Sequence, residues 1–185
     1  MSEDALVREL KAPDLLTRLA AIDKAALDPQ KHAKQVASLM LLYPGDAYFV
    51  LERIPRFGDF MIPPLKEMAE SVPDESIRIL AAIGLAHFKQ PLDNRFLLRA
   101  IHDRSTYQHL ACHALRWLGD QDVIPELLAE LHETSATETV DLDRLSSLIS
   151  CIEALGGTIP SDERTRLIAE GPPLIRKMLD AKRPG

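Results

Sequence analysis

The chain has 185 residues, 46% of them hydrophobic and 27% charged, and a formal net charge of −6 with a pI near 5.5. This size and apolar content are enough for one folded domain over residues 1–185. No run approaches the roughly 18 consecutive apolar residues of a membrane span. Residues 1–4 are acidic where a secretory signal would be basic. We therefore expect a cytoplasmic protein that makes no membrane contact.

A repeated pattern is the strongest organising feature of the chain. Fainter copies begin near Asp14 and Asp46, two clear copies cover residues 74–104 and 104–133, and a last copy begins near Asp141. In the clear copies, apolar or aromatic residues recur at i, i+4, i+8 and i+11, the spacing of one helix face. These residues are Ile77, Ala81, Leu85 and Phe88, and then Tyr107, Ala111, Leu115 and Leu118. The pattern predicts five registers.

Each register is predicted to be a helical hairpin, because the helical period stops at Gly or Pro and then resumes. Gly58, Gly119 and Gly156 are expected to end first helices in a left-handed conformation. Pro63 and Pro64, Pro125 and Pro160 are expected at or near the starts of second helices, where a missing N–H costs nothing. Asp74 is a predicted N-cap. No window alternates as a strand does, so the chain is predicted to be all-α.

The clear copies resemble HEAT-type repeats, in the stretch from Asp74 to Ala82 and in the stretch from His113 to Leu128. That resemblance implies a right-handed α-solenoid of about five antiparallel hairpins, whose apolar–Arg helices line an inner surface. It also implies a ladder of Asp and Arg between repeats. Asp14 with Arg18 and Asp74 with Arg78 match the ladder. Gln108 and Tyr48 stand at other Arg positions, so the ladder is expected to be interrupted.

Two sets of residues raise the question of chemistry. His109 and His113 lie one helical turn apart with Cys112 beside them, and a metal-binding or enzymatic HEAT-like protein using these three residues is one alternative. No further ligand that would complete a metal site with these three residues is evident from the sequence. HEAT-type iron hydroxylases repeat a His–Glu pair on several helices, whereas this chain has the single pair His132–Glu133. Cys112 and Cys151 are predicted to be small buried residues, although a disulfide between neighbouring helices is conceivable. We predict no catalysis, no metal and no cofactor.

A DNA-binding, glycosylase-like solenoid using Arg53, Arg56 and Arg116 is the other alternative. The acidic net charge argues against it, because counterion release needs a row of Lys and Arg. Glu126, Glu130 and Glu133 form an acidic stripe that is expected to be a solvated helix face. Nucleic acid is therefore an unlikely partner.

Two regions are candidates for a binding surface. The helix over residues 77–88 is apolar on nearly all sides, so either neighbouring helices and the segment over residues 174–179 cover it, or Ile79, Ala82 and Ile83 form a binding patch. Aromatic residues are dense between Tyr43 and Phe60, and Tyr48 and Phe49 fall off the buried stripe there.

The favoured interpretation is a non-catalytic protein-binding module: a scaffold, an adaptor, or an inhibitor such as a toxin immunity protein. Its partner would be an amphipathic or acidic protein segment, held on the inner face of the repeat stack. The predicted partner-binding residues are Phe49, Arg53, Arg56, Ile79, Ile83, His109, His113 and Arg116.

Overall fold

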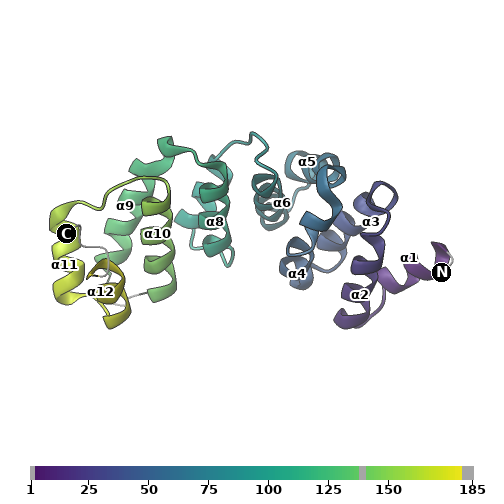
Figure 1. Ribbon diagram of the computed structural model, residues 1–185, viewed down its shortest axis with the longest axis horizontal. Helices are drawn as coiled ribbons and strands as arrows, with labels where there is room; N and C mark the ends of the chain where they lie inside the picture. Colours follow the sequence, from purple (N-terminus) through teal and green to yellow (C-terminus); the bar gives the residue numbers. More distant parts are fainter. Residues whose placement is uncertain (1–2, 138–140, 181–185) are drawn as a thin grey trace. The chain divides into compact units, whose positions relative to one another are not determined.

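The computed structural model describes residues 3–137 and 141–180, and every regular element in them is helical (Figure 1). This confirms the all-α prediction for the part described. The α-helices are α1 (Glu3–Leu10), α2 (Leu15–Ala25), α3 (Pro29–Leu42), α4 (Ala47–Leu51), α5 (Ile62–Ser71), α6 (Glu75–His87), α7 (Arg95–His102), α8 (Gln108–Leu118), α9 (Ile124–Ser135), α10 (Leu142–Ala154), α11 (Ser161–Glu170) and α12 (Pro173–Asp180). Three 3₁₀ segments accompany them: η1 (Pro44–Asp46), η2 (Ile54–Met61) and η3 (Gln121–Val123). Within these ranges no helix has the length and apolar character needed to cross a bilayer. Met1 and Ser2, the first residues of the acidic start, lie outside them.

The chain forms two compact units, and the boundary between them in the sequence falls between Leu92 and Asp93. Unit 1 contains α1 to α6 and unit 2 contains α7 to α12. The clear repeat over residues 74–104 therefore has its first helix in unit 1 and its second in unit 2. The five-hairpin solenoid stays a prediction.

Aspartates begin several helices, among them the predicted N-cap Asp74. The carboxylate of Asp74 accepts from the backbone N–H groups of Ser76 (2.9 Å) and Ile77 (3.3 Å) at the start of α6. Asp14 caps α2 and Asp141 caps α10 in the same way. Each cap satisfies N–H groups that have no partner within the helix.

Glycines and prolines mark the helix boundaries that the sequence predicts. Gly58, Gly119 and Gly156 all have positive φ, at 54°, 71° and 84°. Gly119 ends α8 in the left-handed conformation, and its N–H donates to the carbonyl of Leu115. Prolines occupy the first turns of α5 and α9, and Pro160 directly precedes α11. The predictions are confirmed for Gly119, for Gly156 and for the prolines. Gly58 does not end a helix: it lies inside η2, where its φ of 54° and ψ of −149° produce a kink.

Unit 1 is built around packing of α3 on η2 and of α5 on α6. Its core includes Met40, Phe57 and Leu65, each at most 1% exposed. Gly84 permits close approach of α5 to α6, because a Cβ there would lie 3.0 Å from the Leu65 side chain. Every residue of α6 from Ile79 to Ala86 is buried, so the prediction of a helix apolar on all sides is confirmed.

One rung of the predicted ladder is present in unit 1. The Arg18 guanidinium is 6% exposed and pairs with the Asp46 carboxylate, with Nε to Oδ2 at 2.9 Å. The guanidinium also donates to the carbonyls of Ala12 and Pro13 and lies 4.1 Å from the centre of the Tyr43 ring. Asp46 makes this ion pair instead of capping α4. The rung ties the first register to the second.

In unit 2, α8 packs on α7 and on α10, α9 packs on α10, and α12 packs on α11 and α10 (Figure 1). The segment over residues 174–179, a predicted cover for the apolar helix of unit 1, thus packs on α10 and α11 through α12. Its Ile175 and Leu179 side chains are fully buried.

A buried arginine connects three helices of unit 2. Arg144, 3% exposed, donates from Nε to Thr134 Oγ1 (2.8 Å) and from Nη1 to Gln108 Oε1 (2.9 Å). Its Nη2 pairs with the carboxylate of Glu130. These partners lie on α8 and α9, so one guanidinium from α10 fixes the packing of all three helices. Gln108, which departs from the family pattern, is used here as an acceptor.

Candidate functional site

An exposed aromatic pair lies on α4 in unit 1. Val50 and Ile54 are each 1% exposed, whereas Tyr48 and Phe49 are 41% and 37% exposed. The Tyr48 and Phe49 rings touch edge to face, with centroids 5.7 Å apart. A hydrogen bond to Glu52 raises the pKa of the Tyr48 phenol, so its hydroxyl stays protonated. The prediction that these rings fall off the buried stripe is confirmed.

Two arginines follow this pair in the chain, Arg53 and Arg56, and both contact one carboxylate. Asp23 of α2 accepts from Arg56 Nη1 at 2.6 Å, and Arg53 Nε lies 3.3 Å from the same oxygen without hydrogen-bond geometry. Arg53 Nη1 donates to the carbonyl of Phe49 at 3.1 Å. We call Tyr48, Phe49, Arg53 and Arg56 the aromatic–arginine surface. Asp23 therefore contacts both arginines of this surface.

Ile79 and Ile83 do not belong to an exposed surface. They are 5% and 3% exposed, and Ala82 between them is 2% exposed. Their helix, α6, packs on α4 and α5 and has no solvated side between Ile79 and Ala86. The interpretation that neighbouring helices cover this helix is therefore correct. The prediction of an exposed binding patch at Ile79, Ala82 and Ile83 is wrong, because all three side chains are buried.

The remaining predicted residues come together in unit 2. His109, His113 and Arg116 are exposed on one face of α8. They line a hollow of about 220 Å³ together with Cys112 and with three serines of α10, Ser146, Ser147 and Ser150. Phe49, Arg53 and Arg56 belong to unit 1. The predicted residues are therefore divided between the two units.

The cysteines are buried structural residues. Cys112 and Cys151 are free thiols, 3% and 0% exposed, and the Cys151 thiol donates to the Cys112 carbonyl at 3.3 Å. The neighbouring Cys151 thiol and burial raise the pKa of Cys112, so its thiolate form is disfavoured. Cys112 is therefore a poor metal ligand or nucleophile.

A different cluster gathers potential metal ligands. The ligand atoms of His102 on α7 and of Glu130 and Glu133 on α9 lie within 4.8 Å of one another. In residues 3–137 and 141–180 no other three His, Cys, Asp or Glu side chains come this close. The ligand atoms of His109, Cys112 and His113, in particular, do not form such a group. The Glu130 carboxylate is already shared by His102 Nδ1 (2.6 Å) and by Arg144. This arrangement is an ion-pair network, since the guanidinium supplies the positive charge that a metal ion would otherwise bring.

The acidic stripe of α9 is thus only partly a solvated face. Glu126 and Glu133 are exposed, but Glu130 is half-buried and joins α7, α9 and α10. His132 Nδ1 lies 3.0 Å from Glu163 Oε2 of α11, so this imidazole pairs with a carboxylate of a neighbouring helix. Sequence reasoning missed these contacts because the partners lie on different helices.

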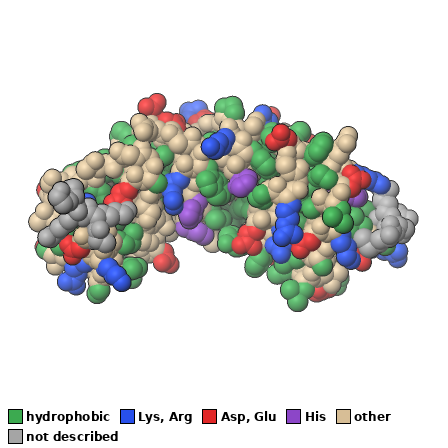
Figure 2. Space-filling view, viewed as in Figure 1, with side chains coloured by type: hydrophobic (Ala, Val, Ile, Leu, Met, Phe, Trp, Pro, Cys, Tyr) green, Lys and Arg blue, Asp and Glu red, His purple; other side chains and the backbone are tan. Residues whose placement is uncertain are grey.

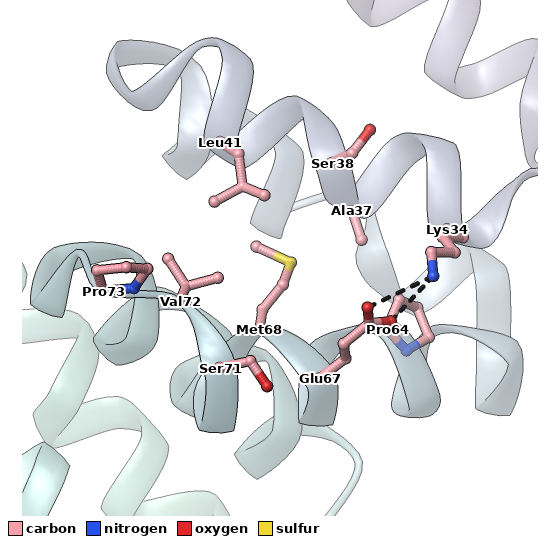
Figure 3. A pocket seen from close by; sticks show the side chains of 10 residues that line it. All are labelled: Lys34, Ala37, Ser38, Leu41, Pro64, Glu67, Met68, Ser71, Val72 and Pro73. Carbon is pink, nitrogen blue, oxygen red and sulfur yellow. Dashed lines mark hydrogen bonds and ion pairs between the residues drawn. The ribbon is translucent and has the colours of Figure 1, made fainter.

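Unit 1 also has an apolar groove between α3 and α5, which sequence reasoning missed (Figure 3). Its volume is about 300 Å³, and an ion pair of Lys34 with Glu67 (3.1 Å) closes one end. Ala37, Leu41, Pro64, Met68, Val72 and Pro73 provide its apolar lining. Leu41, on the groove wall formed by α3, is 43% exposed.

Comparison of the sequence with protein-family models gives no match, and comparison with curated proteins gives none either. The likeness to HEAT-type repeats stays a prediction from the residues of the chain itself.

Proposed function

We propose that the chain is a non-catalytic protein-binding module, acting as a scaffold, adaptor or inhibitor in the cytoplasm. The observation that carries the proposal is the aromatic–arginine surface. Tyr and Arg, together with Trp, are enriched among the residues that carry most of the binding energy of protein interfaces, and Phe is enriched in interface cores.

The distribution of exposed apolar side chains supports this role. Ten large hydrophobic side chains are exposed among the described residues, and seven of them belong to unit 1: Leu16, Leu27, Leu41, Leu42, Tyr48, Phe49 and Phe60. Figure 2 shows hydrophobic side chains at the surface among Lys, Arg, Asp and Glu. An apolar surface with charged neighbours suits a protein partner, because burial supplies affinity and charge selects the partner.

The proposed partner is an acidic amphipathic segment. Its apolar residues would cover Tyr48 and Phe49, and its carboxylates would join Asp23 around Arg53 and Arg56. Arg56 is suited to this, because its side chain is 56% exposed while it contacts Asp23. His109, His113 and Arg116 in unit 2 form a second basic surface for such a segment.

Affinity capture from the native cell extract tests the proposal. We expect the wild-type chain to retain one dominant protein, and Phe49→Asp or Arg56→Glu to lose it while circular dichroism stays unchanged. Leu174→Asp is the matched control, because Leu174 is 53% exposed and lies in unit 2. Equal recovery by all variants would contradict the proposal.

The two alternatives predict different results from the same preparation. Stoichiometric zinc or iron in the purified protein would support a metalloprotein. Salt-sensitive retention on duplex DNA, lost on Arg53→Glu or Arg116→Glu, would support a DNA-binding role.

A further inference from the structure

The hollow between α8 and α10 in unit 2 has a composition that points to a particular ligand. His109, His113 and Arg116 occupy i, i+4 and i+7 of α8, which places them on one helix face. Ser146, Ser147 and Ser150 face them from α10, and the two helices pack directly on each other. Two rigid helices therefore present hydrogen-bond donors toward one small space.

The lining of this hollow carries basic groups and no carboxylate. Its residues are two histidines, one arginine, one cysteine and three serines. Within residues 3–137 and 141–180, the Arg116 guanidinium makes no ion pair or hydrogen bond. In a chain of net charge −6, an arginine without an acidic partner beside two histidines marks a local site for a negative charge.

The hydroxyl groups add uncharged donors. Ser146 Oγ donates to the carbonyl of Asp143 at 3.0 Å, so its oxygen is left as an acceptor. Ser147 and Ser150 make no side-chain hydrogen bond among the described residues, and both are half-buried. Their O–H groups are available to donate to a ligand.

We propose that this hollow binds a phosphate group. A phosphate offers several acceptor oxygens, which match a planar guanidinium fork, two imidazole N–H groups and two hydroxyls. The lining offers no carboxylate and its thiol is buried, so its charge and its donors match an anion better than a cation. The volume of about 220 Å³ admits the phosphate group and leaves the rest of the molecule that bears it outside.

The phosphate could come from a small molecule or from a phosphorylated peptide, and the hollow recognises the chemistry that they share. The proposal deepens the role proposed for the basic surface of unit 2, because it names the chemical group bound there, and it does not depend on the aromatic–arginine surface of unit 1. Failure of protein capture through unit 1 would leave it intact. Failure of the phosphate titration would leave the aromatic–arginine surface intact.

Calorimetric titration of the full chain tests the proposal with three probes: inorganic phosphate, a phosphoserine peptide, and the same peptide without phosphate. We expect saturable binding of both phosphate probes and about a tenfold loss of affinity on Arg116→Gln, the effect of one charge-assisted hydrogen bond. Arg176→Gln is the matched control, since Arg176 is an exposed arginine on α12. The ratio of the affinities for phosphate and phosphopeptide identifies the source of the group.

Three results would overturn the proposal: no saturable binding of either phosphate probe, equal binding of the two peptides, or equal losses for Arg116→Gln and Arg176→Gln. Ser150→Asp is a second variant that keeps the test decisive if Arg116→Gln misfolds. It places a carboxylate in the hollow and should abolish binding.

Proton uptake gives an independent readout. Burial lowers the pKa of His113, and the neighbouring Arg116 and His109 lower it further. These two and Cys112 are the other titratable or charged groups of α8 that line the hollow, and Glu153 is the next acidic residue along α10 after Ser150. A bound anion raises the pKa of His113, so the affinity should rise as pH falls. Sulfate is the probe here, because its charge is constant between pH 5.5 and 8. We expect His113→Gln to flatten this dependence, and an unchanged dependence would contradict a role for His113.

Discussion

His102 and Glu130 show how one exposed imidazole joins two helices of unit 2. His102 Nδ1 lies 2.6 Å from Glu130 Oε1, and the carboxylate raises the pKa of His102. The other oxygen of Glu130 pairs with the buried Arg144. A change of protonation at the surface therefore acts on a network that reaches into the core.

This ion pair predicts a pH dependence of stability. The folded pKa of His102 is raised above its ordinary value of 6.5, so the stabilisation is fully present below that value and is lost as pH rises through the folded pKa. We expect the difference in Tm between wild type and His102→Gln to be largest near pH 6 and to vanish at high pH. Thermal unfolding followed by circular dichroism measures it. His109→Gln, which removes an exposed histidine with no ion pair among the described residues, should show no such trend, and a difference for His102→Gln that does not vary with pH would contradict the account.

At the scale of helices, the boundaries follow from local chemistry that can be read from the sequence. Gly119 and Gly156 follow helices with positive φ, as their conformational freedom predicts, whereas Gly58 has positive φ at a kink inside η2. Asp14, Asp74 and Asp141 cap helices because a short carboxylate reaches the free N–H groups. These features need only neighbouring residues, which is why the sequence was sufficient to predict them.

Gly119→Ala tests the backbone argument directly. A Cβ at Gly119 would meet no atom within 4 Å, so any loss of stability must come from its φ of 71°. We expect the free energy of unfolding to fall by about 1 kcal/mol. Gly45→Ala is the matched control, because its Cβ would also meet nothing and its φ is not positive. Denaturant unfolding that shows equal effects for the two variants would exclude the left-handed cap as the cause.

Asp46→Asn tests the rung between the first two registers. Arg18 is buried, and without the carboxylate its guanidinium loses the only ion-pair partner that it has in the described part of the chain. We expect a loss of about 3 kcal/mol in the free energy of unfolding, the lower end for breaking a buried ion pair. Asp59→Asn, at an exposed aspartate of η2, should cost little, and similar losses for both variants would show that the rung contributes nothing.

At the scale of the whole molecule, the helical class and the burial of the cysteines could be predicted, whereas the exposure of the candidate binding residues could be predicted only in part. Phe49 and His109 were correctly assigned to exposed positions, because they fall off the apolar stripes of their own helices. Ile79 and Ile83 were wrongly assigned to an exposed surface, because the exposure of an all-apolar helix depends on which helices cover it. The His102–Glu130 pair and the α3–α5 groove join residues about thirty positions apart, so they could be found only once the packing was known.

The account as a whole depends on the aromatic–arginine surface as a protein-binding site. The most direct test is the dissociation constant of the captured partner, measured by calorimetry against wild type, Phe49→Asp and Leu174→Asp. We predict that Phe49→Asp weakens binding at least about tenfold, as expected for an aromatic interface residue, while Leu174→Asp binds as wild type does. Equal dissociation constants for all three proteins would contradict the account.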